Sequence, residues 1–201
     1  MNRAAPPGHV RIIGGRLGGS KLPVPDLPGL RPTADRVRET LFNWLQFELA
    51  GARVLDLVAG TGALGFEAAS RGAASVRLLE RDPRVAQGLR DSARRLGADA
   101  VEVEAADALA WLARPPTETF DLAFLDPPFA ADLWTACAQR LEPWLAAPAW
   151  VYVEAPAAAR PALPPDWREH RRGSTREVGF ALYRRVPAGT LVPDQARTID
   201  G

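Results

Sequence analysis

The chain has 201 residues, of which 47% are hydrophobic and 24% charged, so it can bury the core of one main domain with short additions. Its longest stretch without a charged residue, Pro143 to Val153, has 11 residues and contains Pro148. A membrane-spanning helix needs ~18 apolar residues, so none is expected. Residues 1–10 lack the apolar region of a secretory signal, and Cys137 has no second cysteine to pair with. We therefore expect a cytoplasmic protein.

The net charge of +1 conceals an uneven distribution. Residues 1–40 carry seven Lys or Arg against three Asp or Glu, and residues 160–185 again carry seven against three. Residues 41–159 carry ten against sixteen. A polyanion held by the basic ends, with a cationic or hydroxyl-rich ligand in the middle, would explain this asymmetry, although scattered surface charge would also produce it.

The N-terminal part is predicted to form a hairpin and then a helix. Residues 11–24 contain two short apolar segments around four glycines, a pattern typical of a hairpin. Thr33 is a suitable N-cap for a helix from Ala34 to Phe47. Its buried stripe is expected at Val37, Leu41, Trp44 and Leu45, whereas Arg36, Arg38 and Asn43 are expected to point elsewhere.

From Arg53 onward, apolar segments alternate with helical patterns, which predicts an α/β fold with a mostly parallel sheet. Strands are expected at 54–58, 76–79, 101–103, 122–125 and 150–153, and helices near 63–70, 84–96, 108–113 and 131–145. Segments 167–172 and 178–185 are expected to form an antiparallel hairpin at the sheet edge. We thus expect an extension at 1–32, a main domain at 33–186 and a flexible tail at 187–201.

The first strand leads into a glycine loop. Gly60, Gly62 and Gly65 form a G-x-G-x-x-G pattern between a predicted strand and helix, which indicates a nucleotide-binding loop. Glu80 follows twenty residues after Gly60, at the end of the next strand, where a carboxylate accepts both hydroxyls of a ribose. A cofactor that contains a nucleoside is therefore expected.

Carboxylates around this loop favour one cofactor over another. Asp56 precedes the glycines and Asp107 follows the third strand, where it could meet an adenine amino group. Three carboxylates suit S-adenosylmethionine, which is cationic and has no phosphate, better than a dinucleotide. Asp56 could equally anchor the loop, and Asp107 could equally cap the helix that starts at Ala108.

The fourth strand ends in Asp126-Pro127-Pro128-Phe129. Two prolines fix the backbone and present Asp126 and Phe129 at the carboxyl ends of the strands, where α/β sheets bind ligands. Asp126 could accept the hydrogens of an exocyclic amine, and Phe129 could stack on the base, a contact worth ~1–3 kcal/mol. This pattern indicates methylation of an amine on a planar base. No metal is required for it.

These motifs together resemble the RsmD family of bacterial small-subunit rRNA guanine-N2 methyltransferases. The most specific match is the segment 31–45, RPTADRVRETLFNWL, and further matches are 11–15, 21–25 and 62–65. Gly18 and Ser20 stand where the family often has basic residues, and Val58 where Phe is common. The resemblance implies a class I methyltransferase fold and methyl transfer from S-adenosylmethionine to N2 of one guanine of 16S rRNA. In the family this base is guanine 966. The resemblance further implies that the substrate is the 30S subunit or its assembly intermediate.

The resemblance and the motifs give three sets of candidate site residues. The catalytic set is Asp126, Pro127, Pro128 and Phe129. The cofactor set is Asp56, Ala59, Gly60, Thr61, Gly62, Glu80, Arg81, Asp107, Ala108 and Asp126. The RNA-binding set is Arg11, Arg16, Lys21, Arg31, Thr33, Arg36 and Arg38, whose basic members would contact phosphates while the Asp126 corner selects the base. These arginines could also form a solvated face or helix salt bridges, such as one between Arg38 and nearby acids. A monomer is expected.

Other functions use parts of the same pattern. A DNA adenine-N6 or cytosine-N4 methyltransferase shares the chemistry of the Asp126 corner, but 201 residues leave no room for an adequate target-recognition domain. A dehydrogenase that uses NAD explains the glycine loop but not the corner. A non-catalytic rRNA-binding assembly factor explains the basic ends alone.

Overall fold

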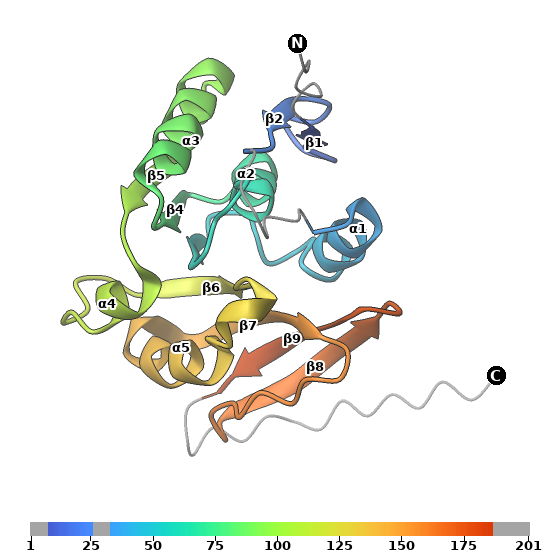
Figure 1. Cartoon of the computed structure of the whole chain (residues 1–201), viewed down its shortest axis with the longest axis vertical. Coiled ribbons are helices and arrows are strands. Elements are labelled where there is room, and N and C mark those ends of the chain that lie inside the picture. Colours follow the sequence, from blue (N-terminus) through green and yellow to red (C-terminus); the bar gives the residue numbers. More distant parts are fainter. Residues whose placement is uncertain (1–7, 26–32, 187–201) are drawn as a thin grey trace, which may run out of the picture.

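The computed structural model describes residues 8–25 and 33–186 (Figure 1). Arg31, the segment 26–32 and the predicted tail at 187–201 lie outside the described residues. The main domain has a seven-stranded sheet in the order β5-β4-β3-β6-β7-β9-β8. Its strands are β3 (Arg53–Asp56), β4 (Ser75–Glu80), β5 (Val101–Ala105), β6 (Phe120–Leu125), β7 (Leu145–Pro156), β8 (Trp167–Ser174) and β9 (Val178–Arg185).

Strand directions confirm the α/β prediction. The strands β3 to β7 pair in parallel, and β9 runs antiparallel to both β7 and β8. The predicted antiparallel hairpin therefore forms the sheet edge. After β5 the strand order returns past β3 to β6, and open α/β sheets bind ligands at such a reversal, beyond the carboxyl ends of the two strands.

Helices cover both faces of the sheet (Figure 1). They are α1 (Asp35–Trp44), α2 (Ala63–Ser70), α3 (Pro83–Leu96), α4 (Ala108–Leu112) and α5 (Trp134–Leu141), with short 3-10 turns η1 (Phe129–Ala131) and η2 (Glu142–Trp144). The apolar residues of α1, α2 and α3 pack in one cluster and those of α4 and α5 in another. No described helix is long and apolar enough to cross a membrane.

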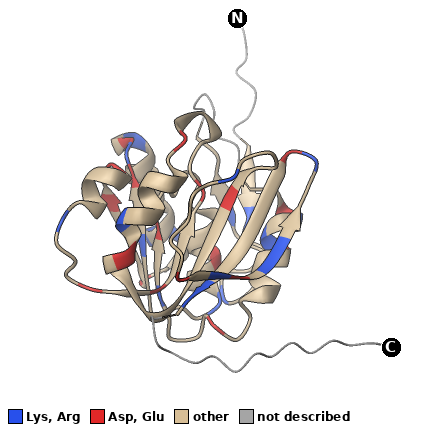
Figure 2. Ribbon diagram, turned by 90° about the horizontal axis from the view of Figure 1, so that it is seen from below, with Lys and Arg blue, Asp and Glu red and all other residues tan. Residues whose placement is uncertain are grey.

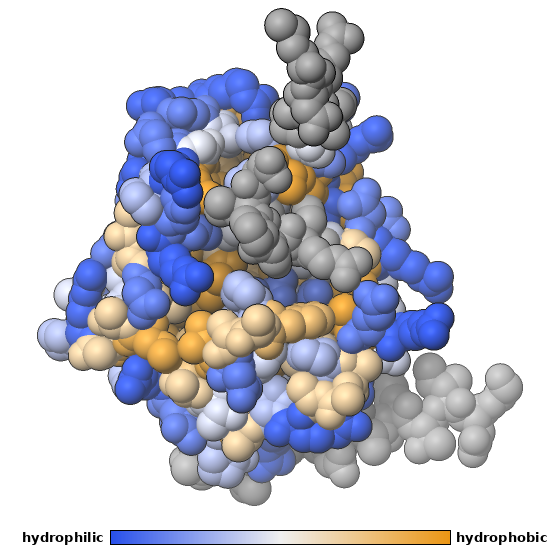
Figure 3. All heavy atoms as spheres, viewed as in Figure 1, coloured by the Kyte–Doolittle hydropathy of each residue, from blue (hydrophilic) through white to orange (hydrophobic). Residues whose placement is uncertain are grey.

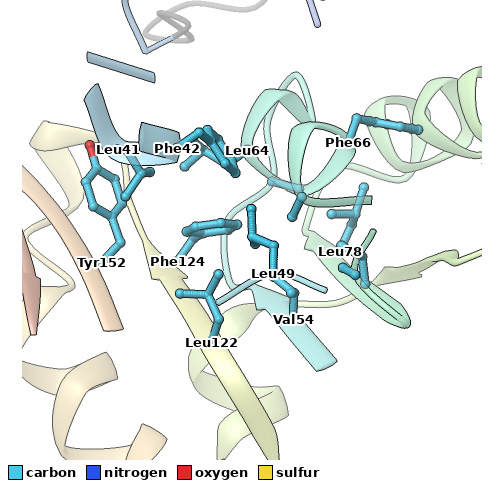
Figure 4. Packing of buried hydrophobic residues seen from close by; sticks show 14 of the residues in the cluster. Leu41, Phe42, Leu49, Val54, Leu64, Phe66, Leu78, Leu122, Phe124 and Tyr152 are labelled. Atoms are coloured by element: carbon cyan, nitrogen blue, oxygen red, sulfur yellow. The ribbon is translucent and has the colours of Figure 1, made fainter. Parts of the chain in front are cut away.

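Aromatic rings meet among aliphatic side chains in the core on the α1 side (Figure 4). The Phe124 ring of β6 meets the edge of Phe42 from α1 at a centroid distance of 6.0 Å and that of Tyr152 from β7 at 6.2 Å. Both contacts are in the edge-to-face geometry that aromatic pairs prefer. They fix α1 over the carboxyl-terminal halves of β6 and β7.

The N-terminal extension pairs β1 (His9–Arg11) with β2 (Lys21–Pro23) in a separate antiparallel sheet. This hairpin docks on α2, because the Ile13 and Gly14 N–H groups donate to the Glu67 carboxylate at 2.7 and 2.9 Å. Gly15 has φ +74°, and a Cβ there would lie 2.0 Å from the Ser70 carbonyl oxygen. The glycine at this turn is therefore required for the close approach to α2.

Three sequence expectations about α1 are wrong. The helix begins at Asp35 and ends at Trp44 instead of spanning 34–47. Thr33 makes no capping hydrogen bond, because its hydroxyl is used by Asp126. Arg38 does not point away from the core but is fully buried, since it donates to the Arg11 carbonyl and to Asp35.

Two further boundaries differ from the sequence expectations. The helix expected at 131–145 is divided into η1, α5 and η2, because Asp132 adopts a left-handed conformation with φ 45° and Pro143 lies in η2. The last parallel strand, β7, runs from Leu145 to Pro156 and is longer than the expected 150–153, since β9 pairs along most of its length.

Candidate active site

The glycine loop connects β3 to α2 in a tight turn. Gly60 and Gly62 have φ 52° and 75°, a conformation that favours glycine. Gly65 lies in the first turns of α2, and a Cβ there would approach Leu78 Cδ2 to 2.2 Å. This confirms that the third glycine allows close packing of helix on sheet. Ala59 and Thr61, the other predicted loop residues, are both buried.

Glu80 lies against this loop at the end of β4. One oxygen of its carboxylate accepts the Gly60 N–H at 3.1 Å and the other accepts the Asp82 N–H at 2.8 Å. The residue is 8% exposed. Each oxygen keeps a second lone pair, so the carboxylate remains able to accept hydrogen bonds from a ligand beside Gly60.

Asp56 anchors the loop from inside. Its carboxylate accepts the N–H of Gly65 at 3.2 Å, and the Val58 N–H stabilises the same charge. Burial raises the pKa of Asp56 to about 7, and the charge of Glu80 adds to the shift. The structure therefore shows the anchoring role, one of the two that the sequence left open.

Asp107 is exposed and caps α4, because its carboxylate accepts the Ala110 N–H at 3.0 Å. This is the capping alternative that the sequence left open. Ala108 is buried under it, and Arg81 after β4 is exposed. Gly60 and Thr61 also line a hollow together with Pro23 and Val24 of the hairpin and Arg84 and Leu89 of α3.

The Asp126 corner follows β6 directly. Pro127 is buried, Pro128 is exposed and Phe129, 43% exposed, begins η1 with its ring 6.1 Å from that of Trp134. The Thr33 hydroxyl donates to Asp126 Oδ2 at 3.0 Å. Figure 3 shows hydrophobic residues exposed in a band across the middle of this face. A rigid carboxyl group thus stands beside a partly exposed aromatic ring.

Glu154 and Tyr152 on β7 belong to the same site but were missed from the sequence. Glu154 is 5% exposed, and its carboxylate accepts the Tyr152 hydroxyl at 2.7 Å. Its backbone carbonyl accepts the Trp134 indole N–H at 2.6 Å. A single acid inside an otherwise apolar strand was the available signal, because an unpaired buried carboxylate is unfavourable.

The electrostatics of the corner are dominated by neighbouring acids. Burial raises the pKa of Asp126 well above its usual range, and the charges of Glu154 and Asp56 raise it further, against the Thr33 hydrogen bond, which lowers it. Burial also raises the pKa of Glu154. The acidic side chains at the carboxyl ends of β3, β6 and β7 therefore favour a cationic ligand beside them.

The predicted RNA-binding residues separate into two groups. Arg11, Arg16, Lys21 and Arg36 are exposed, on the hairpin and on α1. Arg38 is fully buried and paired with Asp35 at 2.7 Å, so the expectation that it contacts RNA phosphates is wrong. Thr33 is 9% exposed and bonded to Asp126. Figure 2 shows Lys and Arg positions spread over several elements of the fold rather than gathered on one.

The strand order, the glycine loop with its acidic partner and the Asp-Pro-Pro-Phe corner together define a class I methyltransferase fold. The chain belongs to the family described as "Conserved hypothetical protein 95", whose model matches residues 10–184. This match and the relatives below confirm the resemblance that the sequence motifs indicated.

Curated relatives and solved structures agree with this assignment. The chain is 45% identical over 185 residues to "Ribosomal RNA small subunit methyltransferase D" of Escherichia coli (strain K12), which covers 90% of this chain and 93% of the relative. It is 41% identical over 182 residues to the protein of the same name from Haemophilus influenzae, with coverages of 88% and 94%.

Among solved structures, "Putative methyltransferase yhhF from Escherichia coli" superposes with a TM-score of 0.83 and 42% identity, covering 90% of this chain and 99% of that one. An RNA methyltransferase from Salinibacter ruber, in complex with S-adenosyl-L-homocysteine, superposes with a TM-score of 0.60 at 17% identity, covering 82% and 97%. At that identity the likeness concerns the fold alone.

Proposed function

We propose that this protein is an enzyme that transfers a methyl group from S-adenosylmethionine to the exocyclic N2 of one guanine of 16S rRNA, in the 30S subunit or its assembly intermediate. The observation that carries the proposal is the corner in which the Thr33 hydroxyl donates to Asp126, directly after β6 and beside β3, the strand that leads into the glycine loop. The names of the curated relatives support rRNA of the small subunit as the substrate class.

The residues present fit S-adenosylmethionine. The carboxyl groups of Asp56, Glu80 and Asp126 lie close together, since the charge of Glu80 raises the pKa of Asp56 and the charge of Asp56 raises the pKa of Asp126. Such a gathering of carboxylates suits a sulfonium and an ammonium group and disfavours a pyrophosphate. The backbone at Gly60 and Gly62 would hold the cofactor, with Glu80 on the ribose hydroxyls and Asp107 at the adenine amino group.

The chemistry follows from the nitrogen that is methylated. The lone pair of an exocyclic amine is delocalised into the ring, so the amine is a weak nucleophile. The Asp126 carboxylate accepts a hydrogen bond from the amine, draws the lone pair from the ring back onto the nitrogen and receives the proton that the nitrogen loses. Phe129 stacks on the base and orients it. When bound, S-adenosylmethionine supplies the electrophilic methyl carbon and keeps the electron pair of the broken methyl–sulfur bond.

Alignment of the amine with the methyl carbon accounts for much of the expected acceleration, because positioning alone is worth ~7–11 kcal/mol. The rigid prolines and the Thr33 hydrogen bond fix the direction of the Asp126 carboxyl group before the base arrives. The guanine must leave its stack to reach this corner, as bases do in enzymes that modify them.

The N-terminal extension, residues 1–32 in our proposal, supplies phosphate contacts through Arg11, Arg16 and Lys21 of the described hairpin, and Arg36 of α1 adds another. Such contacts position the RNA without reading its sequence. The methyltransferase domain at 33–186 selects the base. We propose that the protein acts as a monomer in the cytoplasm, where ribosomes assemble.

The direct test uses 30S particles that lack the modification, labelled S-adenosylmethionine and two matched variants. We expect label at guanine N2 with the wild-type protein and its loss with Asp126→Asn. The control is Asp132→Asn, which should retain activity. Asp132 lies six residues after Asp126, is exposed and has a left-handed backbone conformation that Asn tolerates. Label on duplex DNA instead of rRNA, or no label at N2, would refute the proposal.

A further inference from the structure

Glu154 is a buried acid held rigidly at the corner, and the proposed chemistry does not yet use it. The residue is 5% exposed on β7. Its side chain accepts the Tyr152 hydroxyl at 2.7 Å, and its backbone carbonyl accepts the Trp134 indole N–H at 2.6 Å. These contacts fix both the main chain and the carboxylate of Glu154.

The Thr33 hydroxyl connects this acid to Asp126. It donates to Asp126 Oδ2 at 3.0 Å and also lies close enough to the Glu154 carboxylate to stabilise its charge. Thr33 precedes α1, Asp126 follows β6 and Glu154 is on β7, so three separate segments converge on one pair of carboxyl groups.

We propose that Glu154 is a positioning residue for methyl transfer: its fixed negative charge, held beside Asp126 by Tyr152 and Thr33, makes Asp126 a stronger acceptor for the proton of the guanine amine. This inference rests on the proposed function. Glu154 does not touch the base in this scheme and acts only through Asp126.

The hydroxyl groups that face the pair favour a charged Glu154, and the neighbouring carboxylates favour a proton on Asp126. The Tyr152 hydroxyl donates to Glu154, and it and the nearby Thr33 hydroxyl lower the pKa of Glu154 against the effect of burial. The charges of Glu154 and of Asp56, at the end of β3, both raise the pKa of Asp126. Among residues 8–25 and 33–186, no basic side chain forms an ion pair with either carboxyl group. Burial and Glu154 also keep the Tyr152 hydroxyl protonated, because they raise its pKa.

The proton balance of the step is simple. Ionised Asp126 binds the amine, the nitrogen forms its bond to the methyl carbon, and the methyl–sulfur electron pair stays on sulfur. The nitrogen then loses one proton to Asp126, which returns it to solvent after product release. A neighbouring fixed charge raises the proton affinity of Asp126 toward the working pH, where a general base is most effective.

The test is the pH profile of methylation by Glu154→Gln, an isosteric variant that carries no charge. Without Glu154's charge, Asp126 ionises at lower pH, so we expect the acid limb of kcat/KM to move down by about one pH unit or more. The kcat on the plateau should fall because Asp126 is a weaker base, while KM for S-adenosylmethionine stays near that of wild type. An acid limb at the wild-type position would overturn the inference.

Two further variants sharpen this experiment. Tyr152→Phe keeps the ring in the core and removes only the hydroxyl that stabilises the Glu154 charge, so it should move the limb in the same direction by a smaller amount. It also decides the question if Glu154→Gln fails to fold. Glu104→Gln, on β5 and paired with Arg114, is the matched control and should leave the profile unchanged.

A measurement without substrate separates this inference from the proposed function. Carboxyl groups with a pKa higher in the folded chain than in the unfolded one hold extra protons when folded. The free energy of unfolding therefore falls as pH rises from about 4 through the folded pKa values. In Glu154→Gln this fall should be smaller than in wild type. An equal fall would overturn the pairing of the two acids, whereas a wild-type protein that shows the fall but methylates no rRNA would refute only the proposed function.

Discussion

Glu67 on α2 is the anchor of the N-terminal hairpin, and its replacement tests whether a buried charge holds the proposed RNA-contacting extension in place. The side chain is 0% exposed. Its oxygens accept the N–H groups of Ile13 and Gly14 at 2.7 and 2.9 Å and the Arg71 Nε–H at 2.7 Å. Arg38 Nη1 lies 3.7 Å from Glu67 Oε2, and this nitrogen is fully buried without a hydrogen-bond partner.

The perturbation is Glu67→Gln, which keeps the shape but removes the charge and replaces one acceptor by an NH2 group. That group faces one of the two hairpin N–H donors, so one buried donor loses its partner. A hydrogen bond to a charged group contributes ~1.5–3 kcal/mol, and Arg38 loses a compensating charge as well. Because broken buried pairs cost ~3–5 kcal/mol, we expect the free energy of unfolding to fall by that amount.

The assay is urea unfolding followed by tryptophan fluorescence, with the slope compared between proteins to detect loss of cooperativity. The matched control is Glu169→Gln on β8, an exposed acid paired with Arg172. An exposed ion pair contributes ~0–1 kcal/mol, so the control should remain close to wild type. Methylation of 30S particles by Glu67→Gln should show a raised KM, because the hairpin is released from α2.

A Glu67→Gln variant that unfolds within about 1 kcal/mol of wild type and of the Glu169→Gln control would refute the reasoning. It would mean that the hairpin is held by its apolar contacts alone and that the buried charge contributes little. A normal KM with a large loss of stability would instead separate the anchor from RNA binding.

Two further substitutions, each with a comparison variant, test the loop and the base-stacking residue. Gly65→Ala places a Cβ 2.2 Å from fully buried Leu78, so it should destabilise by ~1–3 kcal/mol and weaken S-adenosylmethionine binding in calorimetry. Gly88→Ala in α3, where a Cβ meets nothing within 4 Å, should instead stabilise by up to ~1 kcal/mol in the same unfolding assay. Phe129→Ala should reduce kcat/KM for 30S particles by an amount equivalent to ~1–3 kcal/mol without changing stability. Phe47→Ala, at a position that is also exposed, should reduce neither kcat/KM nor stability. Equal losses of kcat/KM in the two variants would contradict base stacking by Phe129.

The sequence by itself determined the elements whose cause is local. The alternation of apolar strands with helices, the glycine loop and the Pro127-Pro128 corner each depend on neighbouring residues, and the structure has them close to the predicted positions. The acid at the end of β4 was also predictable, since a parallel sheet brings the carboxyl ends of its strands to one edge. These features sufficed to indicate the fold class and the chemistry.

Only the tertiary structure decided how distant segments pair. Thr33 has the sequence signature of a helix cap but donates to Asp126, 93 positions away, and Arg38 occupies a polar helix position but is buried against Glu67 and Asp35. Glu154 is an acid in an apolar strand, which signals that it needs a partner, but only the pairing of β7 with β6 places it next to the Asp126 corner. A side chain that can satisfy its hydrogen bonds locally or across the fold takes the contact that burial makes more favourable, and burial is set by packing between segments far apart in the sequence.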